Sequence, residues 1–391
     1  MFDYKYLNEE HLTGFNRYKY SAVDTSPLSN YVMHPTWNSI VKVIPRSVAP
    51  NTITFAGFLC MVVVVLTLTA YDYDFYATGG RLGHTRYESE IPNWVFTFCA
   101  VLIFLAYNLD GVDGKQARRI GVSGPLGELF DHGLDSYIVF LIPFSLISVF
   151  GRDPQFSVSC FRGYLIVLSV VMNFYVSHCE KYNTGTLFLP WSYDLSMWVA
   201  SGLFLAAGLF GPQYYKHYTF NGVTFIQILE IVIHSMGIIT TYPVAIYNIC
   251  LSYQNCTGNR LPIAEAVRPV WSMLVMTAAV TFWAVKSPND ILESYPRVFI
   301  FMYGTLFSNI SCRLIIAEMS HNRCELLSWM TGPLLAGILT SLFLPQSEPL
   351  ILHALMILFV VSHVHYGICV VRQICKHLNI SCFSVPKPNS N

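Results

Sequence analysis

Long apolar stretches separated by short polar segments make up most of this chain. A helix needs about 20 mostly apolar residues to cross a bilayer. The third stretch is short and follows a polar segment of helical character, so we expect its helix to begin before residue 136. The pattern predicts about ten membrane helices, near residues 53–70, 92–109, 136–150, 161–178, 195–211, 223–249, 267–285, 298–316, 329–344 and 350–371.

The composition supports a membrane protein. Of the 391 residues, 53% are hydrophobic and 12% are charged, whereas soluble proteins carry about 25% charged residues. The formal net charge is zero, so no overall field attracts nucleic acid. We therefore predict an all-α, polytopic membrane helix bundle in a lipid bilayer, with no nucleic-acid partner. The first 20 residues lack the pattern of a cleaved signal peptide, and we expect the first span to direct insertion.

Basic residues indicate the orientation. An even number of spans puts both termini on one side, and a cytosolic placement of the termini puts most of the 23 basic residues on the cytosolic side. The loop at 71–91 then faces the opposite compartment. Residues 34–50 mix aromatic, apolar and basic side chains, which suits an N-terminal interfacial helix as well as a plain linker.

The spans divide the chain into four expected parts. These are a cytosolic N-terminal segment with the interfacial helix at 1–50, a catalytic transmembrane core at 51–250, C-terminal transmembrane helices at 251–378 and a cytosolic tail at 379–391.

Acidic residues cluster between the second and third spans. Asp110 and Asp113 are three residues apart at the end of the second span, so they share a helix face. Gly124 and Pro125 mark a new helix start. On that second helix, one stripe at helical spacing consists of three acids and a histidine, Glu128, Asp131, His132 and Asp135.

Four aspartates facing one another would repel strongly unless a cation lay between them. Oxygen ligands favour Mg²⁺, Mn²⁺ or Ca²⁺ over zinc, and four acids on two helices suit two ions. The small residues Gly111, Gly114, Ala117, Gly127 and Gly133 leave room beside the acids. The alternative is that the acids are solvated helix-end charges that pair with Lys115, Arg118 and Arg119.

The same segment resembles a family motif. Residues 110–118 fit D-x-x-D-G-x-x-A-R, and residues 127–135 fit G-x-x-x-D-x-x-x-D after an eight-residue spacer. This is the motif of the CDP-alcohol phosphotransferases. The similarity to the eukaryotic ethanolamine and choline phosphotransferases extends over nearly the whole chain, in the segments YKYSAVD (18–24), YVMHP (31–35), APN (49–51), EKYNTG (180–185) and KPNS (387–390).

The resemblance implies transfer of a phospho-alcohol from a CDP-alcohol to diacylglycerol or alkyl-acylglycerol, with release of CMP. It implies that Asp110, Asp113, Asp131 and Asp135 hold the two metal ions. The nucleotide would be bound by Asn51, Gly114, Ala117 and Arg118. It further implies a multi-pass protein of the endoplasmic reticulum or Golgi, with a possible homodimer.

The acceptor hydroxyl is a poor nucleophile and needs a base. His132 is the candidate, with Glu128 one turn earlier to fix the imidazole tautomer, and Asp135 is the alternative base. Glu180, Tyr182 and Asn183 follow the fourth span on the same side and could line an acceptor or headgroup pocket, although a capped helix end explains them nearly as well.

Composition does not choose the alcohol, because aromatic residues that could cage choline abound. The overall likeness favours CDP-ethanolamine, with a choline-using or dual-specificity enzyme as the alternative. A transporter would place acids near the bilayer midplane in paired halves, and a lipid-binding scaffold would not need the aspartates.

Overall fold

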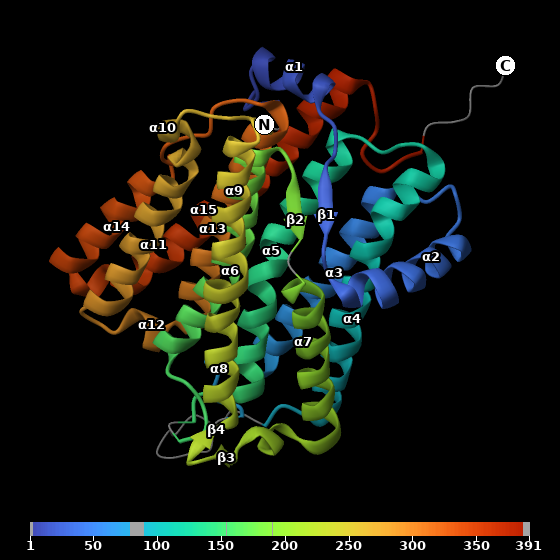
Figure 1. The fold of residues 1–391 in the computed structure, drawn as a ribbon. Helices are drawn as coiled ribbons and strands as arrows, with labels where there is room; N and C mark the ends of the chain where they lie inside the picture. Colours follow the sequence, from blue (N-terminus) through green and yellow to red (C-terminus); the bar gives the residue numbers. More distant parts are fainter. Residues whose placement is uncertain (1–2, 79–89, 154, 190, 386–391) are drawn as a thin grey trace.

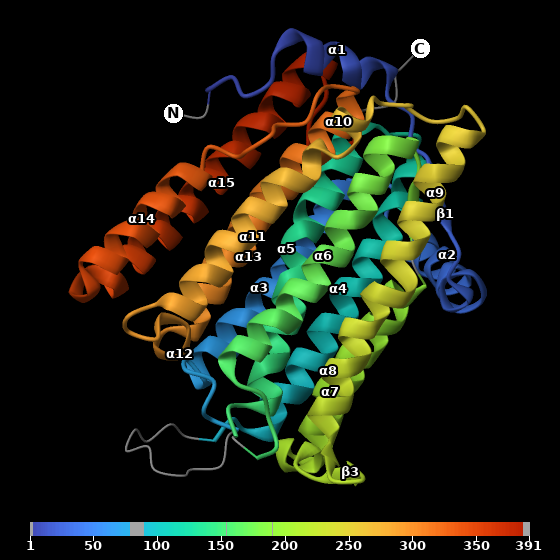
Figure 2. The same cartoon turned by 60° about the vertical axis from the view of Figure 1, so that its left-hand side comes forward.

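The computed structural model describes residues 3–78, 90–153, 155–189 and 191–385. Long, roughly parallel helices form one bundle, which confirms the predicted all-α class (Figures 1 and 2). The first five long helices are α3 (Pro50–Tyr71), α4 (Asn93–Ile120), α5 (Pro125–Phe150), α6 (Cys160–Thr184) and α7 (Ser192–Phe210). The predicted early start of the third span is also confirmed, because α5 begins at Pro125.

The sixth span is a continuous helical stretch. It consists of α8 (Phe225–Met236), the π-helical turn η3 (Gly237–Thr241) and α9 (Tyr242–Gln254). The later long helices are α11 (Arg268–Lys286), α13 (Pro296–Ser320) and α15 (Glu348–Leu378), with the short turns α10 (Ile263–Ala266), α12 (Ile291–Ser294) and η4 (Pro345–Ser347) between them.

The ninth predicted span is shorter than expected. The described residues contain nine helices long and apolar enough to cross a membrane, whereas α14 (Thr331–Phe343) has only 13 residues. A helix of that length spans about 20 Å, which is less than the hydrocarbon core. Leu344 and η4 follow it and turn the chain back, so α14 packs beside α15 as one arm of a hairpin (Figure 2).

Helix α13 occupies the centre of the bundle. In its most apolar stretch 83% of the residues are buried, whereas the corresponding share in the other long helices is 22–50%. It packs against α5, α6 and α15. The C-terminal helices are therefore built into the same core as the helices that carry the acidic motif.

Both terminal segments lie at the end of the bundle that carries the motif. Helix α1 (Glu9–Arg17) lies across this end (Figure 1). The backbone N–H of Tyr6 donates to Gln373 Oε1 at 2.9 Å, which ties the N-terminal segment to the end of α15. This agrees with the prediction that both termini lie on one side of the membrane. The KPNS segment (387–390) and much of the 71–91 loop lie outside the described residues.

The segment at 34–50 is mostly helical. A π-helical turn, η1 (Ser29–Met33), leads into α2 (His34–Val43), which crosses the direction of the bundle helices (Figure 1). Its face with Trp37 and Val41 is buried, and its other face is exposed, as an amphipathic helix requires.

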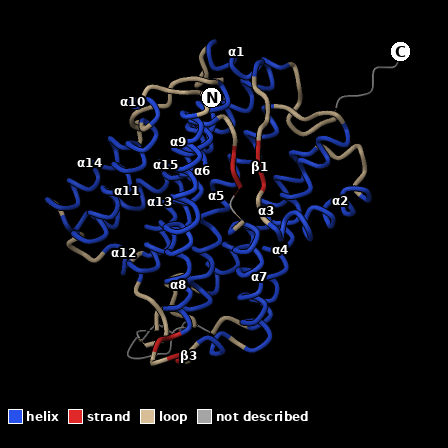
Figure 3. The backbone as a smooth tube through the Cα atoms, viewed as in Figure 1, coloured by secondary structure: helices blue, strands red, loops and turns tan. Residues whose placement is uncertain are grey.

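Strands are few and short, as Figure 3 shows. Strand β1 (Ala22–Asp24) pairs in parallel with β2 (Leu187–Leu189), which fastens the N-terminal segment to the end of α6. Strands β3 (Tyr218–Phe220) and β4 (Val223–Thr224) form a hairpin at the opposite end of the bundle.

Candidate active site

The aspartates of α4 and α5 converge. Helix α4 runs unbroken through Asp110 and Asp113 and stops at Gly121, whose positive φ of 72° suits glycine. Carboxylate oxygens of Asp110, Asp113 and Asp131 lie within 4.8 Å of one another. Asp135 is one turn beyond Asp131 and interacts electrostatically with Asp110 and Asp113. The predicted convergence of two acidic helix faces is therefore present.

Hydroxyl groups from two other helices orient the array. Thr54 Oγ1 on α3 donates to Asp113 Oδ2 at 2.5 Å, and Tyr193 on α7 donates to Asp110 Oδ2 at 2.9 Å. Asp131 Oδ1 is buried and has no hydrogen-bond partner among the described residues. No lysine or arginine within the described chain forms an ion pair with these aspartates, so the alternative of helix-end charges paired with Arg118 or Lys115 is not seen.

This chemistry fits divalent cations. Clustered carboxylates in a partly buried site are costly unless a cation compensates them, and hard cations prefer oxygen ligands. The unpaired oxygen of Asp131 supplies a free ligand atom at the centre of the cluster. The residues present therefore fit the predicted metal site.

The glycines of the motif serve two different purposes. A Cβ on Gly111 would lie 2.2 Å from the Trp37 ring, so this position lets α2 pack against α4. A Cβ on Gly114 would meet only the Arg118 guanidinium, and one on Gly127 only Asn51 Oδ1 at 3.8 Å. Gly114 and Gly127 thus keep open space beside the acids, together with Ala117, which is half-buried.

The two arginines that end α4 differ. Arg118 is exposed and its guanidinium lies over Gly114. Arg119 instead donates to the carbonyl oxygens of Val41 (2.5 Å) and Ile44 (2.7 Å). It therefore holds the end of α2 against α4.

His132 is buried between the acids and α6. Its Nε2 lies 3.8 Å from Asp131 Oδ2, and its Nδ1 has no partner among the described residues. The ring contacts His178 edge to face, with centroids 5.4 Å apart. The unpartnered Nδ1 leaves one ring nitrogen available to accept a proton.

The contacts of Glu128 among the described residues do not include the expected one with His132. Glu128 Oε1 accepts a hydrogen bond from Tyr18 at 2.5 Å and pairs with Lys181. Burial raises the pKa of the Tyr18 phenol, which stays protonated and donates. Glu128 Oε2 is buried without a hydrogen-bond partner among the described residues.

Asn51 lies at the start of α3 beside Gly127. Its Nδ2 donates to the backbone carbonyl of Cys382 at 3.0 Å, and the Phe383 ring packs against Phe55 and Phe130. Asn51 is in the first turn of α3, whose N-cap is Ala49. The C-terminal segment thus reaches the predicted nucleotide end of the site.

Glu180, Tyr182 and Asn183 lie in the last turns of α6 and make mainly structural contacts. Glu180 Oε1 accepts from Asn248 on α9, and Asn183 Nδ2 donates to the carbonyl oxygens of Cys179 and Ala266. The Tyr182 hydroxyl accepts from the Cys324 N–H. No described contact joins these side chains to the aspartates, and a pocket role for Glu180, Tyr182 and Asn183 stays a prediction.

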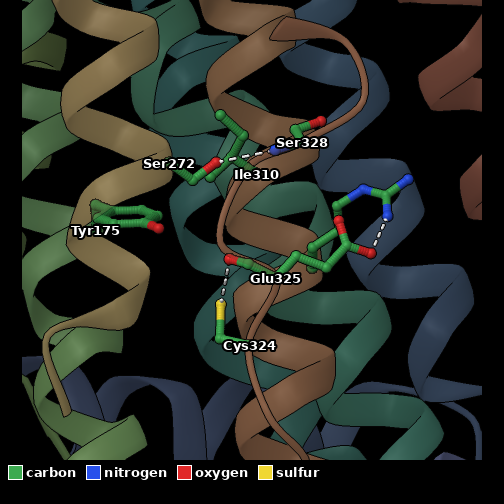
Figure 4. Close-up of a pocket in the computed structure, with 7 residues that line it drawn as sticks. Tyr175, Ser272, Ile310, Cys324, Glu325 and Ser328 are labelled. Atoms are coloured by element: carbon green, nitrogen blue, oxygen red, sulfur yellow. Dashed lines mark hydrogen bonds and ion pairs between the residues drawn. The ribbon is translucent and has the colours of Figure 1, made fainter. Parts of the chain in front are cut away.

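A separate small cavity lies under the loop that follows α13 (Figure 4). Arg313 and Glu325 line this cavity and form an ion pair at 2.5 Å. The Ser328 N–H donates to Ser272 Oγ at 3.3 Å. None of the motif residues lines it.

Comparison with known proteins agrees with this geometry. Residues 47–211 match the family model described as CDP-alcohol phosphatidyltransferase. The chain is 44% identical over 395 residues to ethanolaminephosphotransferase 1 of Mus musculus, covering 100% of this chain and 97% of that protein. This chain belongs to the CDP-alcohol phosphatidyltransferase family. As a member of that family it is a transferase of phospholipid biosynthesis with a multi-pass membrane fold.

Two further relatives bear on the substrate. Ethanolaminephosphotransferase 1 of Homo sapiens is 44% identical over 394 residues, with 100% of this chain and 97% of that protein covered. Choline/ethanolaminephosphotransferase 1 of Arabidopsis thaliana is 29% identical over 409 residues, with 98% of this chain and 99% of that protein covered. The family match at 47–211 includes α3 to α7, the helices that supply Asn51, Thr54, the four aspartates and Tyr193.

Proposed function

We propose that this enzyme transfers phosphoethanolamine from CDP-ethanolamine to diacylglycerol or alkyl-acylglycerol and releases CMP. The observation that carries the reaction is the convergence of the motif aspartates at one end of a membrane bundle, where a water-soluble nucleotide and a lipid can meet. Full-length similarity to proteins named ethanolaminephosphotransferase 1 supports ethanolamine. The Arabidopsis relative's name keeps choline as the second candidate alcohol.

Asp110, Asp113, Asp131 and Asp135 would hold two Mg²⁺ or Mn²⁺ ions, with Thr54 and Tyr193 fixing two of the carboxylates. Such ions, when bound, neutralise the charge that develops on the phosphates of the departing CMP. Arg118 and Asn51 would hold the nucleotide, and Gly114, Ala117 and Gly127 would allow it to approach the backbone.

His132 would accept the proton of the acceptor hydroxyl as the oxygen attacks the phosphorus that carries ethanolamine. The bond from that phosphorus to the CMP oxygen breaks, and CMP leaves with the bonding electrons. Burial of His132 beside the array and its unpartnered Nδ1 support this role. Asp135 remains the alternative base, but an oxygen engaged with a cation is a weaker one.

The acidic end, which also holds both terminal segments, would face the cytosol, and the protein would reside in the endoplasmic reticulum or Golgi. The excess of basic residues at that end supports the orientation. A homodimer stays a prediction from the family.

The test is CMP release by the purified protein from CDP-ethanolamine, with and without diacylglycerol and Mg²⁺. We expect release that requires both additions, and a smaller rate with CDP-choline. Asp113→Asn is the matched inactive control. A protein that releases no CMP under any of these conditions would instead be a transporter or a lipid-binding scaffold.

A further inference from the structure

A buried charge cluster joins three helices beside His132. Glu318 on α13 pairs with Lys181 Nζ at 2.9 Å and with His178 Nδ1 at 3.3 Å, and both partners are on α6. Lys181 also pairs with Glu128 on α5. The side chains of Glu318, Lys181 and His178 are each at most 3% exposed, so water does not screen these interactions.

Each partner of Glu318 leads to the candidate active site. His178 packs edge to face on His132, and Lys181 shares Glu128 with Tyr18. Glu318 thus anchors two α6 side chains, of which His178 packs on His132 and Lys181 pairs with Glu128. Its position on α13 lies outside the residues 47–211 that match the family model.

The charges in the cluster do not balance as a simple ion pair. Two carboxylates, Glu128 and Glu318, share one lysine, and a buried carboxylate is costly unless several groups hold it. A single acid would suffice to neutralise Lys181. Because Glu318 also pairs with Lys181, the lysine bridges α5 and α13 and does not pair with Glu128 alone.

We propose that Glu318 is a positioning residue of the active site, supplied by the C-terminal half of the chain and acting through His178 and Lys181. It fixes the edge of His178 against the His132 ring and limits the pull of Lys181 on Glu128. This proposal rests on the proposed function, because it assigns Glu318 to the placement of the proton-accepting group.

The test compares Glu318→Gln with wild type in the CMP-release assay. The amide keeps the size of the side chain and leaves one acid and one base, a balanced pair, so the bundle should fold. We expect kcat to fall at least 10-fold, with KM for CDP-ethanolamine within 2-fold of wild type. Glu230→Gln is the matched control, since Glu230 is a buried acid that pairs with Arg162 and lies away from His132. It should retain wild-type kcat.

A second variant tests the route through His178. His178→Phe keeps a ring next to His132 but cannot bond Glu318, so we expect a similar fall in kcat. The double variant should then be no worse than about the poorer single variant, because coupled residues are not additive. Wild-type kcat in Glu318→Gln, or multiplied losses in the double variant, would overturn the proposal. An inactive wild-type protein would overturn the proposed function instead.

Discussion

Buried acids occur at both ends of this bundle, and their surroundings differ. At the end opposite the motif, Asp72 is completely buried and pairs with Arg297, whose Nε also donates to the Asp72 carbonyl oxygen at 2.7 Å. The guanidinium packs over Phe75 at 4.1 Å. This acid has its counter-charge within the protein, as a structural residue requires.

At the motif end, Thr54 and Tyr193 donate hydrogen bonds to Asp113 and Asp110, and no lysine or arginine among the described residues pairs with the motif aspartates. The negative charge is concentrated and left for a ligand to compensate. The difference between the two ends separates acids that stabilise the fold from acids that cost stability and serve function.

Removing one motif carboxylate should have the largest effect on activity. Asp113→Asn is expected to lower kcat by at least about 1,000-fold, or roughly 4 kcal/mol in the barrier. The Tm should stay the same or rise, because like charges no longer repel. Steady-state kinetics and thermal unfolding without metal measure both. A variant that unfolds while retaining specific activity would make Asp113 structural, like Asp72.

Removing the proposed base, His132, should have the second-largest effect on activity. His132→Gln is expected to lower kcat by about 100- to 10,000-fold, the usual range for a lost general base. Mn²⁺ affinity, measured by electron paramagnetic resonance, should stay near that of wild type. Substantial turnover in this variant would transfer the role to Asp135.

Removing the counter-charge at the opposite end should affect stability instead. Arg297→Met leaves Asp72 buried without its cation, which is expected to cost about 3–5 kcal/mol of unfolding free energy. The specific activity of the folded fraction should be unchanged. Denaturant unfolding in detergent, followed by the CMP assay, checks this. A loss of kcat without a loss of stability would remove the distinction between the two ends.

Removing a hydroxyl donor to the array should have a smaller effect. Thr54→Val keeps the shape of the side chain but deletes its bond to Asp113, and we expect a 10- to 100-fold loss in metal affinity or activity. Thr69→Val on the same helix, beyond the site, is the matched control. Equal metal affinity and activity in Thr54→Val and Thr69→Val would show that Thr54 does not orient Asp113.

The sequence predicts the features that depend on local pattern. Apolar length locates the helices, Gly124 and Pro125 mark the start of α5, and helical spacing places the aspartates on facing stripes. The length of α14 is overestimated, because the apolar pattern continues through Leu344 while the backbone turns there.

Contacts between distant segments leave no local pattern. The bonds of Thr54 and Tyr193 to the aspartates join residues 59 and 83 positions apart, and the pairing of Lys181 with Glu318 depends on α13 packing at the bundle centre. The sequence predicts that Glu128 supports His132, because the two are one helical turn apart. The spacing does not reveal that Tyr18 and Lys181 both bind Glu128 Oε1.

The central claim is that the motif aspartates bind divalent cations together with the diphosphate of the nucleotide. Electron paramagnetic resonance of Mn²⁺, titrated into the purified protein in the presence of CDP-ethanolamine, tests it most directly. We predict two bound ions per chain, with tight binding lost in Asp113→Asn and kept in Asp72→Asn. Equal Mn²⁺ binding by wild type and Asp113→Asn would contradict the account.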